Sequence, residues 1–329
     1  MVSTILSRAE TLLRSGRHAD AAQMLGTAAG AGDSDALATL AQWRIAGNVV
    51  RRDLTAARAL LARAAAAGDR GSSLLHASFL ASGVGGPDQW AEAVAELTAL
   101  ASNEPRAAAQ LTLLGAMDID SSGFPAVPLD TRKLSSAPHV LCSEHFMTEA
   151  ECSYLKSALE GALQPSLVVD PATGRMIPHP VRKSDFAVFG VHAEDLVVNA
   201  LNRRIAALSG TGLDQGEPLQ LLRYRAGGEY RAHLDALPPA EPNQRILTVL
   251  VYLSDDYQGG ETSFPRTGLS FRGRTGDALL FRNVATDGSP DPLAIHCGLP
   301  VTHGEKLIAS RWIRERRFAY PPPRPILDV

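Results

Sequence analysis

The sequence predicts an α+β protein of two domains: an N-terminal α-helical repeat domain of the α-solenoid type, then a double-stranded β-helix (jelly roll) with supporting helices. The first 118 residues are rich in Ala and Leu at helical spacing. From residue 219 onward, short β-type runs alternate with turns that contain Gly and Pro. With 329 residues the chain is long enough to build a separate core for each part.

A repeat of 36 residues runs through the helical part, because Gly32-Asp33 recurs as Gly68-Asp69. At the same offset other positions also recur: Leu25 and Leu61, Ala28 and Ala64, Trp43 and Phe79, and Gly47 and Gly83. A period in the mid-thirties with small residues at helix contacts is typical of stacked helical hairpins. Residues 5–117 resemble the SEL-like subclass of the tetratricopeptide superfamily. A generic Ala-rich helical bundle stays open as the alternative.

The boundaries follow from changes in composition. We expect a helical repeat domain over 1–118, a linker rich in Pro, Gly and Ser over 119–137, a second domain over 138–318 and a Pro-rich tail over 319–329. In the second domain, helices are expected from Thr148, which begins a capping-box pattern, to about Leu163, and over 193–208. Strands are expected over 219–224, 246–253, 276–281 and 306–314.

His233, Asp235 and His296 form a candidate metal-ligand set. On a strand, residues two apart project to the same face, so His-x-Asp can present two ligands to one ion. Two histidines and one carboxylate suit a non-haem Fe(II) with open positions, although Zn(II) accepts the same ligand types. Lys306 follows His296 by ten residues within a predicted core strand. A lysine buried there requires an anion, unless it lies on an edge strand and reaches water.

The second domain resembles the prolyl 4-hydroxylase family of 2-oxoglutarate dioxygenases over about residues 138–317. The resemblance depends on ordered motifs: Arg182 and Ser184 in VRKSDF, LLRYRAGGEYRAHLD around His233, RILTVLVYLS after Arg245, the GGET turn, GDALLF, His296-Cys297-Gly298, Lys306 and Trp312. It implies Fe(II) held by His233, Asp235 and His296, with 2-oxoglutarate and O₂ as cosubstrates and ascorbate as an optional reductant. No catalytic residue beyond the metal ligands is implied.

The same resemblance assigns further roles. Lys306 and Tyr224 would hold the far carboxylate of 2-oxoglutarate, although Tyr224 could equally be a core tyrosine. Tyr230, Arg245 and Trp312 would line the substrate site, with Trp312 also acceptable as a packing residue. An Asp at position 235, in place of a Gly or Ala, argues against a halogenase.

The implied function is hydroxylation of an unactivated C–H bond, in the first instance of a prolyl residue in a peptide or protein that the repeats recruit, with release of succinate and CO₂. Hydroxylation of a free amino acid or natural-product intermediate is one alternative. A scaffold with an oxygenase domain that senses without turnover is another.

The formal net charge of −3 gives no bulk attraction to nucleic acid. Three isolated cysteines and no long apolar run favour a reduced, cytoplasmic setting without membrane association. The oligomeric state stays open.

Overall fold

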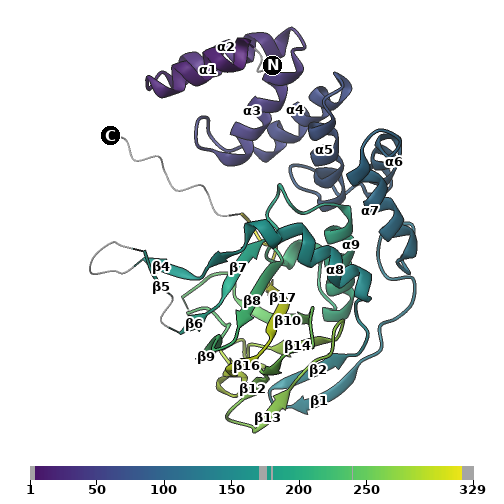
Figure 1. The fold of residues 1–329 in the computed structure, drawn as a ribbon, viewed down its shortest axis with the longest axis vertical. Helices are drawn as coiled ribbons and strands as arrows, with labels where there is room; N and C mark the ends of the chain where they lie inside the picture. The colour runs from purple at the N-terminus through teal and green to yellow at the C-terminus, as the bar shows by residue number, and fades with distance from the viewer. Residues whose placement is uncertain (1–3, 170–175, 179–180, 239, 321–329) are drawn as a thin grey trace. The chain divides into compact units, whose positions relative to one another are not determined.

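The computed structural model describes residues 4–169, 176–178, 181–238 and 240–320 (Figure 1). The chain divides into two compact units, each of which is described by itself. The first comprises residues 1–123, 194–200 and 319–329, and the second comprises residues 124–193 and 201–318. Most of the Pro-rich tail expected at 319–329 lies outside the described residues, since the description ends at Tyr320.

The first unit is built from helices that pack against their neighbours in sequence. They are α1 (Thr4–Arg14), α2 (His18–Gly30), α3 (Ser34–Ala46), α4 (Leu54–Ala66), α5 (Arg70–Ser82), α6 (Trp90–Leu100) and α7 (Pro105–Ala116). Small side chains dominate the contacts, and one buried cluster consists of Ala9, Leu25, Ala29, Ala36, Leu37 and Ala64. The helices can approach closely because alanine adds little bulk at these contacts.

The 36-residue repeat has a structural cause in the turns between helices. Gly32 and Gly68 have φ of 88° and 93°, a left-handed conformation that glycine adopts without steric cost. Asp33 and Asp69 then cap the next helices, accepting hydrogen bonds from the backbone N–H groups of Ala36 and Ser72. The repeated dipeptide therefore ends one helix and begins the next.

The second unit is dominated by antiparallel sheets. An eight-stranded sheet has the order β1-β2-β14-β10-β17-β8-β7-β3, and a five-stranded sheet has the order β13-β12-β15-β9-β6. The first sheet contains β1 (Arg132–Ser136), β2 (His139–Ser143), β3 (Gln164–Pro165), β7 (Asp185–Val188), β8 (Gln220–Arg225), β10 (Arg245–Tyr252), β14 (Ala278–Arg282) and β17 (Glu305–Arg314). The second contains β6 (Arg182–Lys183), β9 (Glu229–His233), β12 (Thr262–Phe264), β13 (Leu269–Phe271) and β15 (His296–Gly298). Two short pairs join β4 (Leu167–Val169) to β5 (Met176–Pro178) and β11 (Gln258–Gly259) to β16 (Val301–His303).

The core of the second unit contains side chains from both large sheets. Leu222, Leu250 and Phe281 of the eight-stranded sheet share one buried cluster with Phe264 of the five-stranded sheet. Strand β10 is buried along most of its length, which explains why its sequence is almost continuously apolar. Helix α8 (Glu149–Leu159) contacts β8 of the large sheet (Figure 1).

The structure differs from the predicted elements in several places, for example at β1 and at the end of α8. Residues 132–136, within the predicted linker, form β1 at the edge of the eight-stranded sheet. Strand β1 is largely exposed, so its polar sequence shows no apolar alternation that would mark it as a strand. Helix α8 has the expected capping box at Thr148 and Glu151, but it ends at Leu159, and a 3₁₀ turn covers 160–162.

A buried ion pair within the second unit links α8 to residues 201–209 of helix α9 (Leu196–Ser209). Arg204 donates to both carboxylate oxygens of Glu151 at 2.7 and 2.8 Å, and the side chains are 10% and 2% exposed. We expect Glu151→Ala to lower the unfolding free energy by about 3–5 kcal/mol, because it leaves a buried guanidinium unpaired. Urea denaturation measures the loss. The double variant Glu151→Leu/Arg204→Met should lose much less, and an equal loss would contradict this explanation.

Within the described part of the chain, none of the helices combines the length and the apolar character that crossing a membrane requires.

Candidate active site

His233 and His296 face each other across two paired strands of the five-stranded sheet. His233 is the last residue of β9 and His296 is the first of β15, and the two residues are direct partners in the antiparallel register. Their ring centroids are therefore only 4.3 Å apart, although 63 residues separate them in sequence.

Each imidazole is oriented by the main chain. The Nδ1 atom of His233 is 2.8 Å from the carbonyl oxygen of Arg231, and that of His296 is 3.0 Å from the carbonyl of Ala294. A carbonyl only accepts, so Nδ1 carries the proton in both rings and Nε2 keeps its lone pair. Burial lowers the pKa of His296 to about 4, which keeps this ring neutral and able to bind a metal at neutral pH.

Asp235 completes the cluster from the bend that follows β9, not from the strand itself. The strand geometry that we expected for His-x-Asp is therefore wrong at Asp235, because β9 ends at His233 and the backbone turns. The carboxylate is nevertheless 3.5 Å from Nε2 of His233 and 3.6 Å from Nε2 of His296. Burial opposes its charge, but the two imidazoles and a hydrogen bond from Thr248 together hold its pKa well below the usual range. Asp235 is therefore an anionic ligand donor.

These three residues fit a single metal ion. One donor atom from each lies within 4.8 Å of the other two. Atoms bonded to one ion at about 2.0–2.2 Å are at most about 4.4 Å apart, so the 3.5 and 3.6 Å separations already suit a shared ion. Two imidazole nitrogens and one carboxylate oxygen are the donor set of non-haem Fe(II) enzymes, which keep the remaining positions open.

Lys306 lies in the same cavity as the three metal-ligand candidates. Its side chain is 3% exposed, and its Nζ donates to the carbonyl oxygen of Gly260 at 2.6 Å. Among the described residues, no carboxylate lies within ion-pair distance of it. Burial lowers the pKa of Lys306 to about 8, because the ammonium loses its hydration. A buried ammonium without a counter-ion is a site for an anion.

Tyr224 is the cross-strand partner of Lys306 in the β8–β17 pair. The Lys306 ammonium is 5.7 Å from the centre of its ring. Burial raises the pKa of Tyr224, so its hydroxyl remains protonated and can donate a hydrogen bond. A lysine and a tyrosine thus share one wall of the cavity, both as donors.

The three residues expected to line a substrate site occupy different positions. Tyr230 and Trp312 line the cavity, and the Tyr230 ring stacks on His233 with centroids 3.5 Å apart. The Trp312 Nε1 atom is buried and has no hydrogen-bond partner in the described structure. Arg245 is not among the cavity-lining residues described. Its guanidinium lies 3.6 Å from the Trp312 ring centroid and donates twice to Glu217, so it supports Trp312 from behind.

Some residues of the site were not in the predicted set. Thr248 of β10 donates to Asp235 at 2.7 Å, and Asn283, just after β14, donates to Thr248 at 2.9 Å. Both lie inside or beside apolar strands, and no local signal marks them. Arg182 and Thr262 also line the cavity. Arg182 appears in the VRKSDF motif, so the resemblance pointed to it without assigning a role.

The cavity is narrow, with a volume of about 40 Å³. That is room for about three water molecules, at about 10–15 Å³ each on this measure. The Tyr230 ring, stacked over His233, lies directly beside the metal-ligand candidates.

The chain is similar to several known proteins. Residues 219–314 match the family model described as the 2OG-Fe(II) oxygenase superfamily. Prolyl 4-hydroxylase 1 of Arabidopsis thaliana is 35% identical over 202 residues, which cover 56% of this chain and 71% of the relative. Probable prolyl 4-hydroxylase 4 of the same plant is 33% identical over 225 residues, covering 61% and 75%. The viral collagen prolyl hydroxylase of Paramecium bursaria Chlorella virus-1, solved with 2OG, aligns with a TM-score of 0.43 and 26% identity over 53% of this chain and 95% of that one.

The metal-ligand geometry and the matched family together define a 2-oxoglutarate-dependent dioxygenase, with Fe(II) as its cofactor and 2-oxoglutarate and O₂ as cosubstrates. Within that class, the chain belongs to the prolyl 4-hydroxylase family.

Proposed function

We propose that this enzyme hydroxylates a prolyl residue within a peptide or protein and releases succinate and CO₂. The observation that carries the proposal is one cavity that holds the His233, Asp235 and His296 cluster together with buried Lys306, which has no counter-ion among the described residues. A metal-binding triad beside an anion-binding lysine suits a dicarboxylic cosubstrate that binds the metal at one end. The prolyl substrate is inferred from the similarity of this chain to the prolyl 4-hydroxylases of Arabidopsis thaliana.

In this proposal His233, Asp235 and His296 hold the Fe(II) ion, which when bound supplies the redox chemistry that activates O₂. Lys306 binds the far carboxylate of 2-oxoglutarate, and Tyr224 donates its hydroxyl to the same carboxylate. Thr248 holds Asp235 in place by its 2.7 Å hydrogen bond.

Tyr230 and Trp312 are the proposed substrate contacts. Trp312 offers an indole N–H that has no partner among the described residues, so a substrate carbonyl can accept it. Arg245 acts through Trp312, since its guanidinium stacks on that ring and is fixed by Glu217. The apolar ring faces and the single donor suit a prolyl residue, which has no N–H of its own.

We further propose a domain organisation in which residues 1–118 are an α-solenoid of SEL-like repeats and residues 138–318 form a double-stranded β-helix. The regular Gly-Asp turns of the first unit support the repeat assignment. The two antiparallel sheets that share a core in the second unit support the jelly roll. The repeats would recruit the peptide or protein substrate, because stacked hairpins offer an extended surface to an extended partner.

Succinate formation tests the function. The full chain is incubated with Fe(II), ascorbate and 2-oxoglutarate, alone, with Pro-containing peptides, or with free proline. Stimulation by peptide together with a 16 Da mass increase on proline is the expected result. Stimulation by free proline alone would favour the small-molecule hydroxylase, and absence of succinate under every condition would favour the scaffold that senses without turnover.

The affinity for 2-oxoglutarate should fall as the pH rises above about 8, because the pKa of Lys306 is lowered to about 8 in the free enzyme. Below that pH the ammonium is protonated and attracts the carboxylate, and above it the ligand must bind together with a proton. The affinity then falls by about tenfold per pH unit until the higher pKa of the complex is reached. Anaerobic calorimetry with Fe(II) between pH 6.5 and 9.5 measures this slope. A flat profile would contradict the role of Lys306.

A further inference from the structure

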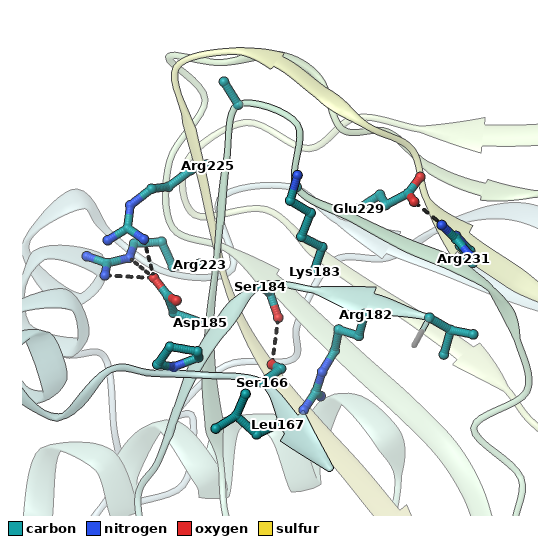
Figure 2. A pocket seen from close by; sticks show the side chains of 14 residues that line it. Ser166, Leu167, Arg182, Lys183, Ser184, Asp185, Arg223, Arg225, Glu229 and Arg231 are labelled. Atoms are coloured by element: carbon teal, nitrogen blue, oxygen red, sulfur yellow. Dashed lines mark hydrogen bonds and ion pairs between the residues drawn. The ribbon is translucent and has the colours of Figure 1, made fainter. Parts of the chain in front are cut away.

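A second hollow, with a cavity volume of about 560 Å³, lies beside the active-site cavity and shares Arg182 with it (Figure 2). We call it the basic groove. Its lining residues come from the end of β3, the start of β4, strands β6 to β9 and the segments between these strands: Pro165, Ser166, Leu167, Val181, Arg182, Lys183, Ser184, Asp185, Arg223, Arg225, Ala226, Gly228, Glu229 and Arg231. Arg182 therefore lies at the boundary between the active-site cavity and the larger basic groove.

Positive charge predominates in the basic groove. Its lining includes five cationic side chains and two carboxylates. Figure 2 shows the carboxylates at opposite ends: Asp185 with Arg223 and Arg225 at one end, and Glu229 with Arg231 at the other. Asp185 is 2.8 Å from Arg223 and 2.7 Å from Arg225, and Glu229 is 3.0 Å from Arg231.

Glu305, outside the lining, adds one more carboxylate, at 3.5 Å from Arg225 and 3.9 Å from Arg223. The carboxylates thus pair with the arginines at the two ends, and Glu229 is also the cross-strand partner of Lys183, the cation in the middle of the groove.

Lys183 occupies that middle position. Its side chain is exposed and extends between the two ion-paired ends in Figure 2. Among the described residues, no carboxylate lies within ion-pair distance of its ammonium. Its neighbour Arg182 projects to the other side of β6, with its guanidinium 5.6 Å from the ring centre of Tyr230. Of the two consecutive cations of β6, Arg182 thus lines both cavities, whereas Lys183 lines the basic groove and not the active-site cavity.

Two sheet edges meet at the basic groove. Strand β6 is the last strand of the five-stranded sheet, and β3, which ends at Pro165, is the last strand of the eight-stranded sheet. Edge strands are where extended peptide segments bind, since their backbone geometry matches that of a strand. The shape and position therefore suit a chain segment that continues from the active site.

We propose that the basic groove binds an acidic stretch of the substrate chain, adjacent in sequence to the proline that is hydroxylated. The proposal rests on the proposed prolyl hydroxylation and adds a specificity for flanking Glu or Asp residues. Lys183 is its central determinant, because no carboxylate of the described chain lies within ion-pair distance of its ammonium, and its cross-strand neighbour Glu229 is paired with Arg231. Carboxylates of a bound segment would pair with Lys183 and share the arginines at the two ends.

Three peptides with the same proline-containing core test this specificity. One carries three Glu residues before the core, one carries three Glu after it, and one carries Gln at all six positions. One of the Glu peptides should have a KM about 5- to 10-fold below that of the Gln peptide, as expected for two or three solvent-screened ion pairs. Its kcat should stay within about twofold, and the KM difference should shrink at 0.5 M salt, where charges are strongly screened.

Variants then assign the effect to the groove. Lys183→Glu should reduce the KM ratio of the Gln and Glu peptides to one or below, and Lys183→Gln should reduce it partly. Lys133→Glu, a change at an exposed lysine on β1 of the same unit, is the matched control and should keep the full ratio. Equal KM values for the three peptides, or a ratio preserved in Lys183→Glu, would overturn the proposal.

Fluorescence anisotropy of the labelled peptides measures binding without turnover, so it tests the binding of an acidic segment separately from prolyl hydroxylation. Tighter binding of a Glu peptide that is lost in Lys183→Glu supports the groove even if no peptide is turned over. Turnover of the Gln peptide without any preference for Glu would leave prolyl hydroxylation standing and overturn the groove.

Discussion

Replacing His296 by Ala is expected to reduce 2-oxoglutarate turnover to background, a loss of at least about 100-fold, because a bound metal contributes several kcal/mol to the reaction it supports. His296 supplies one of the two imidazole nitrogens of the cluster, and its Nε2 is 3.6 Å from Asp235. Two ligands would remain, too few to hold Fe(II) firmly. Succinate release and the iron content of the purified variant are the measurements.

Cys297→Ser is the matched control for that variant. Cys297 is the next residue on β15, is partly exposed and is not among the described residues that line the active-site cavity. The control should keep its iron and its turnover. An unchanged iron content in His296→Ala would show that another side chain is the third ligand.

Lys306→Met should raise the KM for 2-oxoglutarate by about 30-fold to several thousand-fold, since breaking a buried, hydrogen-bonded charge pair costs about 2–5 kcal/mol. Methionine keeps much of the length of the side chain and removes only the charge and its hydrogen bond to Gly260. Steady-state kinetics at varied 2-oxoglutarate, with the peptide substrate saturating, measures the effect.

The same substitution should raise the unfolding free energy of the ligand-free protein, because a buried ammonium without a counter-ion destabilises the fold. Lower affinity and higher stability in one variant distinguish a binding role from a structural one. Lys133→Met, at an exposed position, should change neither. A Lys306→Met protein that is less stable and still binds 2-oxoglutarate normally would contradict the assignment.

The sequence was most informative where chemistry requires particular residue types. His233, Asp235, His296 and Lys306 could be singled out because such side chains are expensive to bury without a ligand, and the structure brings all four to one cavity. The strands rich in Val, Ile and Leu were also predicted, and β10 and β17 lie within two residues of their expected bounds. The apolar pattern of these strands reflects their burial directly.

Other features depend on pairing between distant segments and leave no local trace. The hydrogen bonds that join Asp235, Thr248 and Asn283 exist because β10 pairs with β14. Arg245 lies behind Trp312 because β10 also pairs with β17, a relation that residue types do not specify. The bend that carries Asp235 and the polar edge strand β1 were missed because neither needs an apolar pattern to form.

The hydrogen bonds from the histidine Nδ1 atoms have a consequence for how this enzyme can change. Both acceptors are main-chain carbonyls, those of Arg231 and Ala294, and an amino-acid substitution at these positions leaves a carbonyl in place. The backbone therefore supplies the hydrogen bond that orients each imidazole, whereas Asp235 accepts its hydrogen bond from a side chain, that of Thr248. A substitution of Arg231 or Ala294 should therefore leave these two hydrogen bonds in place.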